Sequence, residues 1–209
     1  MVSKGQFLER STVIPLARGV LEGLSHRGKR TPPLLIIPPP PGRGGMDQPV
    51  AAELAWAVTR AGHATLRFNF RGVGASPGPP GGPEAQAEDV EAALRVLEET
   101  TGTAAPALAS LGGSAATVLG LERLHPGLAG LALVSPEGLE VEELARVRHP
   151  LLVVVGEEEP LPRAALAAAV AEAGGRLVVV AGADARYQRN LPEVGRAVAQ
   201  WLPGLAPSA

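Results

Sequence analysis

The chain has 209 residues and a mass of 21.4 kDa, enough for one domain that buries about 70% of the surface exposed by its unfolded chain. Hydrophobic residues make up 45% and charged residues 19%, which indicates a globular protein, and a net charge of −2 lacks the basic excess that nucleic-acid binding needs. Cysteine is absent, so disulfides, thiolate catalysis, zinc–cysteine sites and iron–sulfur ligation are excluded. Only four histidines are available for imidazole chemistry.

The composition also bears on temperature and location. Lys4 and Lys29 are the only lysines among the 19 basic residues, and thermolabile residues are few, which is typical of a heat-adapted protein or, equally, of a GC-rich coding sequence. The stretch 1–19 mixes charged residues into its apolar ones, unlike a signal peptide, and no apolar run approaches the length of a membrane span. We therefore expect a cytoplasmic protein.

The predicted elements begin with an antiparallel hairpin at a sheet edge, formed by 12–16 and 19–25 within residues 1–30. Strands are then predicted at Leu34–Ile37, Ala64–Phe68, Ala107–Leu111, Leu128–Val134, Leu151–Val155 and Leu177–Val180. Helices are predicted at Asp47–Arg60, Glu84–Thr100, Ser114–Leu124, Leu161–Ala173 and Pro192–Trp201. Asp47 is placed to cap the first helix, and we expect a single domain over 1–209 with a frayed tail at 203–209.

The alternation of strands and helices predicts an α/β fold, a mostly parallel, doubly wound sheet with helices on both faces. Proline and glycine gather at 38–45 and 72–83, each after the carboxyl end of a strand, where open α/β sheets bind ligands. A polyproline run can also act as a rigid spacer or docking ligand. Here, however, both clusters are short and lie between core elements.

One short motif points to chemistry. Gly112-Gly113-Ser114-Ala115-Ala116 follows a predicted strand directly and opens a predicted helix, the setting in which a strained serine presents its hydroxyl above the sheet. The small neighbours fit because such a turn packs too closely for larger side chains. The motif predicts a nucleophile elbow with Ser114 as the nucleophile.

Two further segments carry a family resemblance. The stretch Arg67-Phe68-Asn69-Phe70-Arg71-Gly72-Val73-Gly74-Ala75-Ser76-Pro77-Gly78 and the stretch Gly44-Gly45-Met46-Asp47-Gln48-Pro49 resemble the small bacterial α/β-hydrolases, dienelactone-hydrolase-like, that carry a proline-histidine loop. The resemblance covers almost the whole chain and implies an α/β-hydrolase fold. The short stretch between Val134 and Leu151 leaves little or no room for a cap domain. A dinucleotide site at Gly72-x-Gly74 is excluded because prolines, not a helix start, follow it.

The resemblance also implies a catalytic site. It makes Ser114 the nucleophile and Glu159 the acid, with oxyanion donors from the backbone of Ala115 and, after the proline run, Gly42. The histidine of the family aligns with Ala185, whose methyl group takes no proton. A second histidine of the family aligns with Pro39, and the four prolines at 38–41 offer no N–H.

No other histidine is placed to serve as the base. Three of them, His63, His125 and His149, precede predicted strands, so they belong to the sheet edge opposite the elbow, and His26 belongs to the edge hairpin. A strand of five residues is about 17 Å long, whereas proton transfer needs about 3 Å. Losing the base of such a triad lowers turnover about 10⁶-fold.

Two functions remain open. The first is a nominal serine hydrolase of small esters or acyl compounds with a degenerate triad, in which a carboxylate replaces the histidine as base for Ser114. The second is a non-catalytic descendant of the same scaffold that binds a small ligand or a protein partner. The charged residues at 157–159 and Arg186 and Arg189 then form salt bridges that close a disused site.

We expect no cofactor and no metal, because hard cations need ligands from several elements and the glutamates at 157–159 come from one loop. The expected partner is a small-molecule substrate or ligand, with no nucleic acid and no membrane, and a homo-oligomer is left open.

Overall fold

The computed structural model describes residues 8–205, which form eight strands and six α-helices. The strands are β1 (Arg10–Pro15), β2 (Val20–His26), β3 (Arg30–Ile37), β4 (His63–Phe68), β5 (Ala107–Leu111), β6 (Gly130–Val134), β7 (Leu151–Gly156) and β8 (Arg176–Val180). The helices are α1 (Pro49–Arg60), α2 (Pro83–Thr101), α3 (Ala115–Glu122), α4 (Val141–Leu144), α5 (Arg163–Glu172) and α6 (Leu191–Trp201). Two 3₁₀ turns, Gly112–Ser114 and Leu202–Gly204, precede α3 and follow α6.

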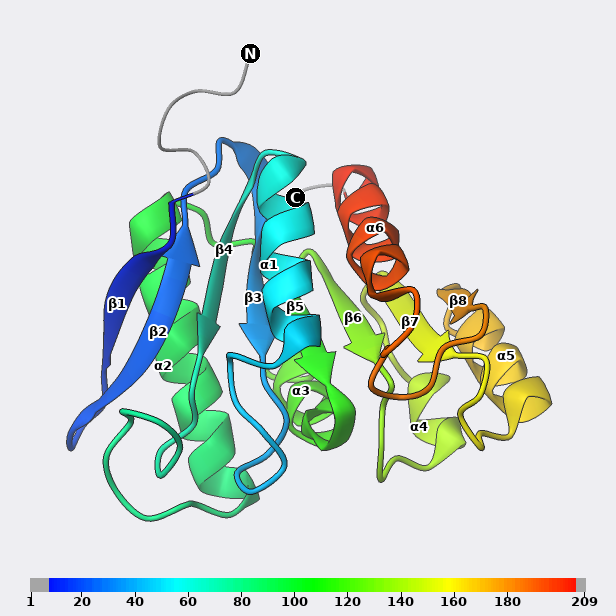
Figure 1. Ribbon diagram of the computed structural model, residues 1–209, viewed down its shortest axis with the longest axis horizontal. Helices are drawn as coiled ribbons and strands as arrows, with labels where there is room; N and C mark the ends of the chain where they lie inside the picture. The colour runs from blue at the N-terminus through cyan, green and yellow to red at the C-terminus, as the bar shows by residue number, and fades with distance from the viewer. Residues whose placement is uncertain (1–7, 206–209) are drawn as a thin grey trace.

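All eight strands belong to one sheet, in the order β1-β2-β4-β3-β5-β6-β7-β8. The β1–β2 and β2–β4 pairs are antiparallel and every other pair is parallel. The arrowheads of β3 to β7 consequently point the same way in Figure 1. Because the carboxyl ends of parallel strands meet at one edge, the loops after β3, β5, β6, β7 and β8 converge there.

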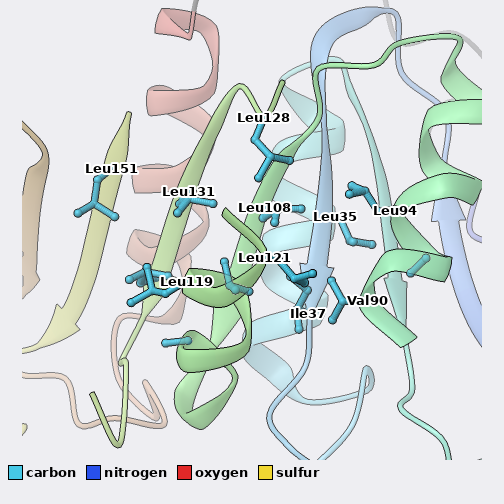
Figure 2. Close-up of a cluster of buried hydrophobic side chains, with 14 of the residues drawn as sticks. Leu35, Ile37, Val90, Leu94, Leu108, Leu119, Leu121, Leu128, Leu131 and Leu151 are labelled. Carbon is cyan, nitrogen blue, oxygen red and sulfur yellow. The ribbon is translucent and has the colours of Figure 1, made fainter. Parts of the chain in front are cut away.

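Helices cover both faces of the sheet, as the alternating pattern predicts. Side chains of α1 and α6 pack on one face of the strands, and those of α2, α3 and α5 pack on the other. Leu35, Leu108 and Leu131 lie in register on β3, β5 and β6. They meet leucines of α2 and α3 in the second of these layers (Figure 2). The predicted fold, a mostly parallel sheet with helices on both faces, is confirmed.

Apart from the exact ends of the elements, three local predictions differ from the structure. The N-cap of α1 is Gln48 without a side-chain capping bond, and the Asp47 carboxylate instead lies 3.8 Å from the Arg67 guanidinium. The one-turn helix α4 had no sequence signal because four residues show no periodicity. Of the predicted tail, Leu205 is buried and follows a 3₁₀ turn, and 206–209 lie outside the described residues. No helix among the described residues is long and apolar enough to span a membrane.

The loop after β4, which carries the family-like stretch, is fixed by the buried side chain of Asn69. Its Oδ1 accepts a hydrogen bond from the Met46 N–H at 2.7 Å, and its Nδ2 donates to Glu22 at 2.6 Å. Ser76 Oγ in turn donates to the Asn69 carbonyl at 2.8 Å. Asn69 therefore joins the loops after β3 and β4 to strand β2, which positions the segment that enters α1.

Candidate functional site

A cavity of about 370 Å³ opens at the carboxyl end of the sheet, the position predicted for a ligand. Most of its lining comes from the loops after β3, β5, β6 and β8, and the rest from the adjoining ends of α1, β5 and β6. The lining residues are Pro39, Gly42, Arg43, Gln48, Val50, Leu111, Gly112, Gly113, Val134, Ser135, Glu137, Ala185, Arg186 and Tyr187.

Gly112 holds the sharp turn between β5 and α3. It is the first residue after the strand, its φ is +56°, and it lines the cavity. This is the place where an α/β-hydrolase carries its strained nucleophile. A Cβ added at Gly112 would meet only Glu137, with Cδ at 3.9 Å and Oε1 at 4.0 Å. The position therefore has room for a side chain, but glycine fills it.

Ser114 lies two residues further on, in relaxed helical conformation with φ −75° and ψ −4°. It is fully buried, it does not line the cavity, and its Oγ donates to the Pro38 carbonyl at 2.6 Å. The Ala115 N–H, the first predicted oxyanion donor, bonds back to the Gly112 carbonyl. Gly42, the second, lines the cavity with a φ of +84°.

Glu159, the predicted acid, belongs to a buried polar cluster with Ser135 and Tyr187. Ser135 Oγ donates to Glu159 Oε1 at 2.7 Å and lies 2.8 Å from the Tyr187 hydroxyl. The Gly156 N–H also donates to Glu159, and the Tyr187 hydroxyl donates to the Val154 carbonyl at 3.1 Å. Glu159 is thus satisfied by hydroxyl and backbone donors, and two of the three side chains reach the cavity wall.

Two members of this cluster have unusual backbone conformations. Ser135 has a φ of +45° and Tyr187 a φ of +51°, and non-glycine residues with such values concentrate at functional sites. Burial raises the pKa of Tyr187, the hydrogen bond from Ser135 opposes this, and Glu159 adds to it. The phenol therefore stays protonated and is a neutral member of this buried cluster beside the cavity.

Sequence reasoning missed Gly112, Ser135 and Tyr187 as site residues, although each has a signal. Gly112 and Ser135 each follow a predicted strand directly. Tyr187 is the only tyrosine of the chain and stands two residues after Ala185.

The mouth of the cavity carries charged groups. Arg43 donates from Nη2 to Glu137 Oε2 at 2.9 Å, which links the loop after β3 to the loop after β6. Arg186 is exposed and, within the described residues, has no carboxylate within ion-pair distance. The predicted salt-bridge cluster at 157–159 reduces to one long ion pair, Arg189 to Glu158 at 3.9 Å. In the described part of the chain, no three acidic or histidine side chains gather as metal ligands.

None of the four histidines lines the cavity. His63 opens β4 and its Nδ1 bonds to the Pro32 carbonyl at 2.7 Å. His149 bonds to Glu122 at 2.8 Å, and His26 bonds to Thr65 at 3.2 Å. His125 lies 3.8 Å from Glu91.

Comparison with solved structures identifies the class of protein. An alpha-beta serine hydrolase homologue from Coxiella burnetii is 28% identical, over 92% of this chain and 97% of that one, with a TM-score of 0.78. A putative alpha/beta hydrolase from Agrobacterium tumefaciens is 21% identical over 96% and 100%, with a TM-score of 0.80. A dienelactone hydrolase from Anabaena variabilis is 16% identical over 96% and 99%, again with a TM-score of 0.80. No protein-family model and no curated protein matches the chain.

These structures match almost the entire chain, each with a TM-score of 0.78 or above. The chain therefore has the α/β-hydrolase fold, with serine hydrolases and their homologues as structural neighbours. The resemblance stated from the sequence is confirmed at the level of the α/β-hydrolase superfamily.

Proposed function

We propose that this protein is a non-catalytic α/β-hydrolase-fold protein that binds a small ligand in the cavity at the carboxyl edge of the sheet. The observation that supports this most is Gly112, which stands at the strained turn after β5 and brings no nucleophile to the cavity. The four loops still enclose a space of about 370 Å³, within the range of small-molecule sites. The scaffold therefore keeps a binding site without the group that attacks.

The missing base supports the same proposal. The loop after β8 carries Ala185 at the cavity, where the family resemblance places a histidine, and none of the four histidines lines the cavity. A serine hydroxyl is a weak nucleophile without a base in hydrogen-bond reach. Because the turn has neither an exposed serine nor a base beside it, the cavity lacks an activated nucleophile for covalent catalysis.

A second candidate is the impaired serine hydrolase of small esters, with Ser114 as nucleophile. The similarity to serine hydrolases and the place of Ser114 beside the turn favour it. Its hydroxyl, however, must leave the Pro38 carbonyl and reach the cavity before it can attack. The substitutions Gly112→Ser and Ala185→His, together with a fluorophosphonate probe, distinguish this candidate from the first.

The test adds the two groups that the cavity lacks. Gly112→Ser and Ala185→His are made singly and together, and the turnover of p-nitrophenyl acetate and labelling by a fluorophosphonate probe are measured. Because a Cβ at Gly112 has its nearest neighbour, Glu137 Cδ, 3.9 Å away, we expect the double variant to gain turnover, with neither activity nor labelling in the wild type. A nucleophile with its base exceeds the background reaction by orders of magnitude.

A matched control uses the other serine. Ser114→Ala in the double variant leaves turnover unchanged if the turn position carries the nucleophile. Fluorophosphonate labelling of the wild-type protein at Ser114, abolished by Ser114→Ala, would overturn the proposal and establish the second candidate.

A further inference from the structure

The charged groups of the cavity indicate what kind of ligand it takes. Glu137 lies over the turn, with its Oε1 at 4.0 Å from the position of a Cβ at Gly112, and its own N–H donates to the Gly112 carbonyl at 3.3 Å. Its other oxygen accepts a hydrogen bond from Arg43 at 2.9 Å. A carboxylate of the chain thus already stands at the mouth of the cavity, held by an arginine.

Arg186 adds a second guanidinium to the same cavity. It lies on the loop after β8 and lines the same cavity as Arg43, and no carboxylate of the described residues pairs with it. The cavity lining therefore carries two arginines and one glutamate, a net charge of +1. An isolated guanidinium beside a ligand-sized space favours an anion.

The remaining wall supplies an apolar surface. Pro39, Val50, Leu111 and Val134 line the cavity together with Ser135 and Tyr187, whose hydroxyls bond to each other in the buried cluster. A ligand that matches this lining has one anionic end and a compact apolar body.

The ion pair that covers the mouth is easily opened. The side chain of Arg43 is 70% exposed and that of Glu137 is 51% exposed, and ion pairs between exposed side chains are weak. A ligand carboxylate can replace Glu137 on Arg43 without breaking a buried contact.

We propose that the cavity binds a small organic acid, with its carboxylate between Arg43 and Arg186 and its apolar body against Val50, Leu111 and Val134. Glu137 acts as a built-in competitor that holds Arg43 while the site is empty. This inference rests on the proposed function, since it names the ligand class of the same cavity.

The experiment compares three probes of one shape by calorimetry at low salt: phenylacetate, the neutral phenylacetamide, and phenyl phosphate. We expect wild-type protein to bind phenylacetate about tenfold more tightly than phenylacetamide, as for one charge-assisted hydrogen-bonded contact. Glu137→Gln frees Arg43, so the affinity for phenylacetate should rise several-fold. Arg186→Gln should lower it about tenfold.

Arg189→Gln is the matched control, because Arg189 lies on the same loop but does not line the cavity. It should leave binding unchanged. Equal binding of phenylacetate and phenylacetamide refutes the carboxylate site while the ligand-binding function stands. Tighter binding of phenyl phosphate also refutes the choice of a carboxylate, as does weaker binding by Glu137→Gln. Absence of binding of all three probes refutes this inference, whereas ester turnover by the wild type refutes the non-catalytic function on which the inference rests.

Discussion

Two serines near the end of β5 are equally buried but differ in their hydrogen bonds. Ser110 and Ser114 are both 0% exposed. Ser114 donates to the Pro38 carbonyl, whereas the Ser110 hydroxyl has no partner among the described residues. A buried polar group without a partner keeps its full desolvation penalty, and a paired one does not.

Substituting each serine with alanine should therefore change the free energy of unfolding in opposite directions. Ser110→Ala should raise the free energy of unfolding by about 1 kcal/mol, because it removes an unsatisfied hydroxyl at little change in volume. Ser114→Ala should lower it by about 1 to 2 kcal/mol, because it leaves the Pro38 carbonyl without this donor. Urea denaturation of both variants measures the difference, and equal shifts would contradict the assigned bonding.

At the scale of elements, Arg71 joins the loop after β4 to helix α2 through ion pairs to Asp89 and Glu88. Arg71 donates from Nε and Nη2 to Asp89 Oδ1 at 2.8 and 2.6 Å, and its N–H donates to Oδ2 at 3.0 Å. Asp89 is 0% exposed, while the Arg71 side chain is 23% exposed. The hydrogen bond to Asp89 raises the pKa of Arg71 and so keeps the guanidinium charged.

Asp89→Asn should therefore destabilise the fold by about 2 kcal/mol, since it removes the buried one of the two carboxylates that pair with this partly buried guanidinium. Glu88→Gln is the matched control. Glu88 also contacts Arg71 Nη2, at 3.0 Å, but it is 69% exposed, so we expect a change within about 0.5 kcal/mol. Equal losses in thermal denaturation of the two variants would show that burial does not decide the strength of this contact.

At the scale of the whole molecule, buried histidines make stability depend on pH. Burial lowers the pKa of His26 and of His63 below the usual 6.5. The charge of Glu9 opposes this in part at His26, and the hydrogen bond to the Pro32 carbonyl opposes it in part at His63. As pH falls below about 6.5 the unfolded chain takes up these protons first, so the free energy of unfolding decreases. Glu122 acts in the same direction at lower pH. Burial raises its pKa, but hydrogen bonds from His149 and Arg148 outweigh burial and lower the pKa below 4.5, so the free energy of unfolding decreases further as the pH falls.

We expect the free energy of unfolding to fall between pH 6.5 and 5.5 by up to about 1 kcal/mol for each buried histidine. The double variant His26→Gln/His63→Gln should flatten this slope, whatever its stability at pH 7.5. His125→Gln, at a partly exposed site, should keep it. Denaturant midpoints at pH 7.5, 6.5 and 5.5 provide the measurement, and an unchanged slope in the double variant would assign the effect to other groups.

Much of the fold could be predicted because buried parallel strands appear as short apolar runs. Ala107–Leu111 is the same in the prediction and the structure, and the other strands differ by only a few residues at their ends. The turn after β5 could not be resolved in this way. Residue types do not report φ, so the sequence does not tell whether Gly112 or Ser114 takes the left-handed conformation.

The polar cluster could not be predicted from local sequence patterns, for a different reason. Ser135, Glu159 and Tyr187 follow three different strands and meet only because β6, β7 and β8 are neighbours in the sheet. That adjacency is a long-range property, whereas each residue alone is an ordinary loop residue.

The glycine at the turn has an evolutionary consequence under the proposed function. Gly112 adopts a φ of +56° without the steric penalty that a Cβ brings, which is about 1 to 2 kcal/mol. A return to hydrolysis through Gly112→Ser alone would lose that stability and gain nothing until a base also appeared at Ala185. Neither substitution alone gives activity, and Gly112→Ser alone costs stability. Under the proposed function, selection for a folded protein therefore opposes a return to hydrolysis.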